Sequence, residues 1–314
     1  MTSRVLSLLT LATLLCPACA YEEEDVEFRM PSTTTGTGGG PGNGTVFNTN
    51  VVDMAAVSEL RQPIGVVHQG AALGAVVLEG GQVVDHFEVV GGDVVAHATT
   101  GEVFSGTQLN GSRWWIIAGE DSFVGEWVDM GDRVLIDGWP HWRFSREGFT
   151  GTTCLTGEGP GYARLLPGFS LNEATGQVTA LADNTYVACT NGATGKAAGW
   201  GYYDLAMDLE DLEIFEVAIR TIRADYCYDG VSHTVAGVPL LIEDAWAVNL
   251  QGIDEEEERK IEAVWGESGL LCRGSGRLEA IPPSCGGEKA KIPSCQPGTT
   301  IDTYPDAMFV TRLP

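Results

Sequence analysis

The chain has 314 residues with 18 Lys or Arg against 43 Asp or Glu, which gives a formal net charge of −25. Because phosphate-binding surfaces need an excess of basic side chains, this balance argues against nucleic acid and anionic lipid headgroups as partners. The 44% hydrophobic content is too high for a disordered chain, and no apolar run reaches the roughly 18–20 residues that span a bilayer.

Residues 1–20 read as an export signal, in which an early Arg precedes an apolar core from Val5 to Leu15 and small residues follow. Ala18-Cys19-Ala20 fits a cleavage site of the A-x-A type, which predicts a secreted protein that begins at Tyr21. The alternative is a lipoprotein signal, with Cys19 as the lipidated first residue of a membrane-anchored protein. Both alternatives place the protein outside the cell or in the cell envelope.

Residues 21–50 are predicted to form a flexible spacer, acidic at first and then rich in Gly and Thr, because they can bury little apolar surface. Residues 51–150 are expected to be rich in β-strands, since apolar runs alternate with Gly pairs such as Gly80-Gly81 and Gly91-Gly92, as in hairpins. The strand candidates are Gly65–Val67, Ala75–Leu78, Val83–Val90, Arg113–Ile117, Phe123–Val128 and Arg133–Ile136. Their spacing suggests antiparallel sheets in a sandwich or barrel-like unit.

An amphipathic helix is expected from Leu205 to Arg223, with Asp204 as its N-cap. Its apolar residues recur in steps of three or four and so share one face; they are Leu205, Leu209, Leu212, Phe215, Ile219 and Ile222. A second helix is expected from Asp254 to Trp265, where Asp254 and Glu257 resemble a capping box. We therefore expect a mainly β fold with one or two helices (α+β), antiparallel sheets and stabilising disulfides.

Six cysteines lie beyond the export signal, and an even number in an exported chain predicts disulfides. Sequence alone does not choose among the many connectivities. We expect nearest-neighbour pairing, as Cys154–Cys189, Cys227–Cys272 and Cys285–Cys295. A zinc site is not expected, because none of these cysteines has C-x₂₋₄-C spacing and no H-x₃₋₅-H pattern exists.

The predicted helix leads directly into Ala224-Asp225-Tyr226-Cys227-Tyr228-Asp229-Gly230. With an upstream block from Val187 to Tyr202 and a downstream block from Ile261 to Cys272, this motif resembles the ADYC-domain family of uncharacterised exported bacterial proteins. The resemblance covers about residues 150–285. It implies export and a disulfide-bearing domain, and it implies no activity.

The resemblance also sets the expected organisation of the second half of the chain. We expect an ADYC-like domain over residues 151–285 and an irregular C-terminal tail over 286–314. Family members are expected to carry two further cysteines, at positions that correspond here to Ala197 and Ala218. The absence of both cysteines together is what the loss of one disulfide would look like, and it leaves an even number of cysteines beyond the export signal. Whether residues 51–150 and 151–314 form one domain or two stays open.

The motif has a structural and a catalytic interpretation. In the structural one, Cys227 anchors the helix end, Asp225 accepts hydrogen bonds from main-chain amides, and Asp229-Gly230 forms a tight turn, while Tyr226 fills space. In the catalytic one, Asp225 or Asp229 acts with His233 as an acid–base pair in an extracellular hydrolase. Ser232 or Cys227 would then be the nucleophile.

The remaining sequence indicates no cofactor and no metal, since the histidines are scattered and only His86 and His97 are expected on neighbouring strands. Tryptophans are dense around Trp114-Trp115, and adjacent strand residues face opposite sides, so one exposed ring could suit a glycan or protein ligand. The other members of this group are Trp127, Trp139 and Trp142. The function we expect is a non-enzymatic binding or structural module of the envelope. Its ligand and oligomeric state stay open.

Overall fold

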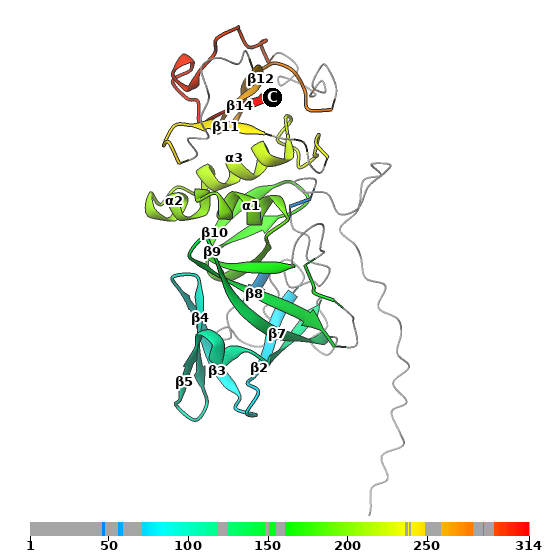
Figure 1. Ribbon diagram of the computed structural model, residues 1–314, viewed down its shortest axis with the longest axis vertical. Coiled ribbons are helices and arrows are strands. Elements are labelled where there is room, and N and C mark those ends of the chain that lie inside the picture. Colours follow the sequence, from blue (N-terminus) through cyan, green and yellow to red (C-terminus); the bar gives the residue numbers. More distant parts are fainter. Residues whose placement is uncertain are drawn as a thin grey trace, which may run out of the picture. The chain divides into compact units, whose positions relative to one another are not determined.

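A computed structural model describes residues 46–47, 56–58, 71–118, 125–147, 151–154, 161–235, 238, 240–248, 259–278, 285 and 292–313 (Figure 1). All of them belong to one structural unit, Thr35–Pro314. The predictions about the export signal, Cys19, most of the spacer, the strand at residues 65–67 and the first part of the second helix lie outside the described residues.

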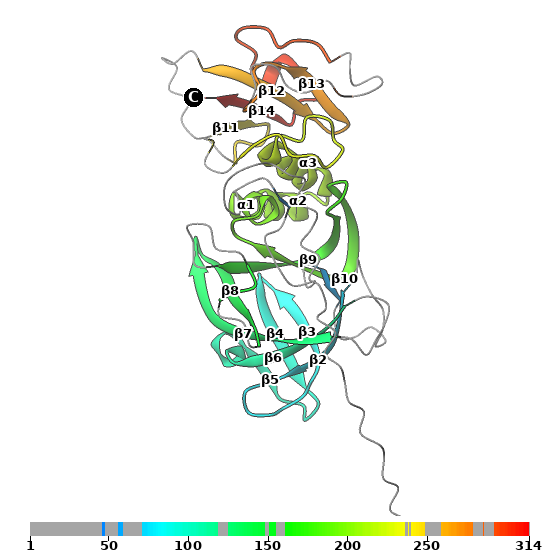
Figure 2. The same ribbon diagram turned by 90° about the vertical axis from the view of Figure 1, so that its right-hand side faces the viewer.

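Seven strands form an antiparallel sheet in the order β1-β10-β9-β8-β7-β6-β2. Their bounds are β1 (Ala56–Ser58), β2 (Ala71–Val77), β6 (Ser112–Ala118), β7 (Gly125–Ile136), β8 (Trp139–Arg146), β9 (Tyr162–Asn172) and β10 (Gln177–Cys189). Because β1 also contacts β2, the two edges of this sheet approach each other. A three-stranded sheet of β3 (Val84–Val90), β4 (Asp93–Ala98) and β5 (Val103–Ser105) lies beside it (Figure 2). The two sheets share an apolar core that contains Phe87, Trp114 and Trp142.

The glycine pair between β3 and β4 forms the predicted hairpin turn. Gly91 and Gly92 have φ angles of 58° and 78°, so both lie in the left-handed region that a two-residue turn of type I′ requires. Along β4, buried and half-buried residues alternate, as expected for a strand with one covered face. The predicted antiparallel strands are therefore confirmed in this region.

Three α-helices of the described chain follow β10: α1 (Ala193–Gly199), α2 (Tyr202–Asp208) and α3 (Leu212–Arg223). A four-stranded sheet follows them, in the order β11-β14-β12-β13. Its strands are β11 (Leu241–Asp244), β12 (Lys260–Gly266), β13 (Gly269–Arg273) and β14 (Phe309–Leu313). In Figure 1, the helices lie between β9–β10 and this second sheet, and α3 contacts β10 on one side and β12 and β14 on the other. Phe215, Trp265 and Phe309 belong to the core that α3 shares with both sheets.

The predicted helix from Leu205 to Arg223 is two helices. The chain leaves α2 after Asp208, and Glu210 adopts a left-handed φ of 56° before α3 begins. Asp204, the predicted N-cap, lies inside α2; the N-cap of α3 is Asp211, whose carboxylate accepts the Glu213 amide at 3.1 Å. Apolar residues of both helices pack into one core, so the spacing of apolar residues continues across the break between the helices. Leu209 lies at this break and is 52% exposed.

The described part of the second predicted helix forms a strand, and the C-terminal tail is not irregular throughout. Val264 and Trp265 lie in β12, and both are fully buried because one faces a small core under β13 and the other faces α3. A strand covered on both faces loses its alternation, and its apolar run then resembles a helix. Residues 309–313 of the expected tail form β14, which pairs with both β11 and β12. Helix α1 was not predicted.

The three disulfides of the described chain confirm one predicted pair and correct two. Cys154–Cys189 forms as expected, whereas the other four cysteines pair as Cys227–Cys285 and Cys272–Cys295. A parallel bridge from Arg273 to Ser294 lays the segment after residue 292 beside β13, and it brings Cys295 to Cys272 with a Cα–Cα distance of 5.0 Å. Sequence proximity therefore did not decide the pairing.

The N-terminal segment is held against the helices at residues 46–47, inside the range expected to be a flexible spacer. The main-chain carbonyls of Val46 and Phe47 accept the first amides of α1, from Ala193 and Thr194, each at 3.1 Å. The Phe47 ring is 3% exposed and lies under the guanidinium of Arg223, which is 3.6 Å from the ring centre. The expected spacer is therefore too long at its C-terminal end.

Candidate functional site

The Ala224–Cys227 motif begins where α3 ends. Ala224 has φ 54° and ψ 41°, a left-handed C-cap conformation that usually favours glycine. The Asp225 amide then donates to the Arg220 carbonyl at 3.0 Å and closes the helix end. The Ala224 methyl is fully buried in the core that contains α3, so this residue contributes to core packing as well as to the helix cap.

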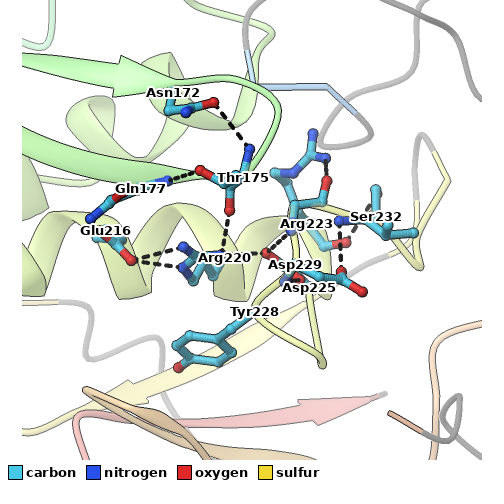
Figure 3. A network of polar contacts seen from close by, with 12 residues as sticks. Asn172, Thr175, Gln177, Glu216, Arg220, Arg223, Asp225, Tyr228, Asp229 and Ser232 are labelled. Atoms are coloured by element: carbon cyan, nitrogen blue, oxygen red, sulfur yellow. Dashed lines mark hydrogen bonds and ion pairs between the residues drawn. The ribbon is translucent and has the colours of Figure 1, made fainter. Parts of the chain in front are cut away.

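The Asp225 carboxylate holds the turn that follows the helix (Figure 3). One oxygen accepts the Asp229 amide, and the other accepts the Gly230 amide, both at 3.0 Å, together with Nη1 of Arg220 at 2.6 Å. Asp225 is 0% exposed; burial raises the pKa of its carboxyl, and the Arg220 charge and the two amides oppose that shift. Gly230 has φ 82°, and a Cβ there would lie 2.3 Å from the Ala174 carbonyl oxygen, so glycine is required.

Arg220 links three parts of the chain through one guanidinium. Its Nε and Nη2 both donate to one carboxylate oxygen of Glu216, one turn earlier on α3, at 3.0 and 2.8 Å, and its Nη1 pairs with Asp225 in the motif. It also donates to the Thr175 carbonyl in the β9–β10 turn at 3.0 Å and lies 4.9 Å from the Tyr228 ring centre. A planar group with several fixed donors is needed for this geometry, which lysine would not reproduce.

Arg277 caps the other carbonyls at the end of α3. Its guanidinium donates to the carbonyls of Ile222, at 2.6 Å, and of Thr221, while Nε pairs with Glu262 on β12 at 2.7 Å. The Tyr226 hydroxyl donates to the same Glu262 oxygen at 2.6 Å. Helix C-terminal carbonyls attract cations. We call the following residues the motif cluster: Glu216, Arg220, Asp225, Tyr226, Glu262 and Arg277.

The two motif tyrosines act as fixed hydrogen-bond donors. The Tyr228 hydroxyl donates to the Gly266 carbonyl at 2.7 Å, and Tyr226 stacks on Trp265 with 5.7 Å between ring centres. Burial raises the pKa of Tyr228, and burial followed by the Glu262 charge raises that of Tyr226. Both phenols therefore stay protonated at neutral pH, which suits a structural role.

The sequence-predicted nucleophiles are engaged elsewhere. Cys227 is bonded to Cys285, and a disulfide sulfur is not a thiolate nucleophile. The Ser232 hydroxyl donates to the Arg223 carbonyl at 3.0 Å, and the His233 amide donates to the same oxygen at 3.1 Å. Ser232 and His233 thus help to close the end of α3.

The predicted acid–base residues lie in different surroundings. Asp225 is fully buried, whereas Asp229 is exposed and accepts the Val231 amide at 3.0 Å. The His233 ring is half-buried and stacks on Tyr226, with 5.7 Å between ring centres. Asp225 accepts hydrogen bonds from two main-chain amides and from Arg220, and Asp229 accepts one from a main-chain amide, which matches the structural interpretation of the motif.

The aromatic and histidine candidates of the β-rich region take mixed positions. Trp114 and Trp142 are buried, whereas the half-buried Trp115 packs on Trp127 with 5.3 Å between ring centres. The half-buried Trp139 lies 3.9 Å from the Arg164 guanidinium. His86 and His97 do face each other across β3 and β4, as stacked rings 4.3 Å apart. Within the described residues, no group of three or more His, Cys, Asp or Glu side chains is placed to hold a metal ion.

Sequence reasoning missed most of the motif cluster. Arg220 was interpreted only as a favourable charge at a helix end, Glu262 entered only as part of the downstream block of the resemblance, and Arg277 gave no signal. The partners of Arg277 are main-chain carbonyls more than fifty residues away, and no side-chain pattern encodes such a contact.

Fold and site together define a mainly β, disulfide-linked protein in which a short motif closes a central helix. The sequence profile of the ADYC domain matches residues 106–279, more than half of the chain, and the chain belongs to this family. The match begins within the region that we expected to precede the domain. No curated protein and no solved structure is significantly similar to the chain. In the described part, no helix is both long and apolar enough to cross a membrane.

Proposed function

We propose that the protein is an exported or surface-tethered module of the cell envelope that binds or supports other components without catalysing a reaction. One observation carries this proposal: Asp225, Cys227 and Ser232, three of the groups that could react, are used to hold the end of α3 and the turn after it. Cys227 is oxidised, and Asp225 is buried under Arg220 and two amides. A catalytic carboxylate or thiolate must instead reach its substrate.

The disulfides also support the proposed compartment. Three disulfides join all six cysteines that lie beyond the predicted export signal. Such bonds persist in oxidising compartments and are rare in the cytosol. They support an extracellular or envelope location. The predicted export signal agrees with this location, whether the mature protein begins at Tyr21 or at a lipidated Cys19.

The intact mass of the natively exported protein, measured with and without reduction, tests this location. We expect a mass that starts at Tyr21 or at an acylated Cys19, and a gain of two hydrogens per disulfide on reduction. An uncut leader with titratable thiols at all six positions would contradict the proposal.

Arrays of glycans and envelope proteins, probed with the full-length exported protein, test the binding function against the hydrolase alternative. We expect a bound class and no turnover. The hydrolase predicts turnover that Asp229→Asn or His233→Gln removes while the melting temperature is unchanged. Observing that pattern would replace the binding proposal.

A further inference from the structure

A cleft of about 590 Å³ opens between the first turn of α3, the turn that joins β12 to β13, and the segment before β14. This volume lies within the range of small-ligand sites, which is roughly 300–1,000 Å³. Trp246 and Met308 line it, and the Trp246 ring is braced by buried Phe309, with 5.8 Å between ring centres. The cleft is separate from the motif cluster and contains none of its residues.

The carboxylates of the cleft are Asp211, Glu213, Glu267 and Asp306, and none of the described lining residues is basic. Glu213 on α3 and Glu267 in the β12–β13 turn are both exposed and lie close enough for their carboxylates to interact. Partial burial, the contact with Glu267 and the charges of Glu267, Asp211 and Glu216 raise the pKa of Glu213. The cleft therefore holds negative charge that no described lining residue neutralises.

We propose that this cleft binds a segment of a partner polypeptide that carries a lysine or arginine side chain next to an apolar residue. The cation lies between Glu213 and Glu267 and bonds to both carboxylates. The methylenes of its side chain and the apolar neighbour lie against Trp246 and Met308.

The choice of a polypeptide follows from the lining. A metal ion or a small hydrophilic cation would leave the apolar wall of Trp246 and Met308 in contact with water, whereas a basic and apolar segment covers the wall and the carboxylates together. This assignment rests on the proposed binding function, whose ligand class it names.

The test is calorimetric titration of the full-length protein with a short blocked peptide in which lysine alternates with leucine. The paired variant Glu213→Gln/Glu267→Gln removes the two facing carboxylates. Its matched control is Glu79→Gln/Glu102→Gln, which removes the same charge from exposed positions beside the three-stranded sheet. We expect the cleft variant to bind roughly tenfold more weakly, the loss of two partly exposed ion pairs, and the control to bind as the wild type does.

Several results would overturn the proposal. Equal weakening in both paired variants would mean general attraction to an acidic protein. Equal affinity for spermidine, or for the peptide with glutamine in place of lysine, would remove the assigned ligand class. Glu267 lies in a turn outside α3, so we expect the single variant Glu267→Lys to abolish peptide binding while the melting temperature stays unchanged. Unchanged peptide binding by this variant would also contradict the proposal. If the peptide does not bind but the arrays identify another ligand, the cleft is not the binding site, and the proposed binding function still stands.

Discussion

The β-rich region (β2–β8) and the motif region (α3, the Ala224–Gly230 turn and β11–β14) are stabilised differently. In the first, apolar side chains fill the core, and ion pairs such as Arg113–Glu147 are exposed, with 42% and 66% of the two side chains accessible. In the second, the pairs Arg220–Asp225 and Arg277–Glu262 are at most 4% exposed. Removing one partner of such a buried pair leaves a buried charge with fewer opposing groups, so these residues fix one arrangement of helix, turn and sheet.

The largest expected effect separates the two regions directly. Asp225→Asn removes the charge that faces Arg220 and should lower the free energy of unfolding by about 3–5 kcal/mol, measured by urea denaturation without reductant. Asp229→Asn, four residues on and exposed, is the matched control and should lose at most about 1 kcal/mol. Equal losses in the two variants would mean that the buried pair does not stabilise the motif region.

The next effect tests whether the N-terminal segment belongs to the motif region. Phe47→Ala empties a site that is 3% exposed beside Arg223 and should lower the free energy of unfolding by about 3 kcal/mol. The control is Phe104→Ala on β5, where the ring is only half-buried, and we expect a loss of about 1 kcal/mol there. A smaller loss at position 47 than at 104 would show that the contact adds little stability.

A third change should strengthen the motif region. Ala197 on α1 and Ala218 on α3 are at most 1% exposed, belong to one core and lie on helices in contact. The resemblance places the two absent family cysteines at these positions. We expect Ala197→Cys/Ala218→Cys to form a fourth disulfide worth about 2–3 kcal/mol, shown by a mass that thiol alkylation leaves unchanged and by a higher melting temperature. Two alkylated thiols would contradict this.

The smallest effect concerns the β-rich region. His141 on β8 is 5% exposed, and burial lowers its pKa below the value of 6.5. His141 therefore binds a proton more readily in the unfolded chain than in the folded one. The contribution of the neutral, buried imidazole to the free energy of unfolding is complete above about pH 6.5 and is lost as the pH falls. We expect the stability of His141→Gln to fall less steeply between about pH 7 and 5 than that of the wild type. Parallel pH profiles would contradict this.

Elements whose cause is local could be predicted from the sequence. The Gly91-Gly92 turn needs only two positive φ angles, and the strands around it need only alternation. The break between α2 and α3 could not be predicted, because the apolar period continues through Leu209. Trp265 was assigned to a helix because burial of both faces of β12 is a tertiary property.

For the site, the residue types of the motif were sufficient to predict the structural roles of its side chains but not to identify the residues that they contact. The roles of Asp225 as an acceptor of main-chain amides and of Cys227 as a covalent anchor follow from the sequence. The identity of Cys285 and Arg277 as partners depends on how β12 and β13 pack on α3. No spacing rule contains that information.

The order of the cysteines has a consequence for biogenesis. Cys227–Cys285 and Cys272–Cys295 interleave along the chain, so Cys227 and Cys272 both precede the cysteines with which they pair. If the chain is exported N-terminus first, as proposed, Cys227 and Cys272 reach an oxidising compartment before Cys285 and Cys295 and can form a non-native disulfide there. We therefore expect a disulfide isomerase to speed the oxidative refolding of the reduced protein.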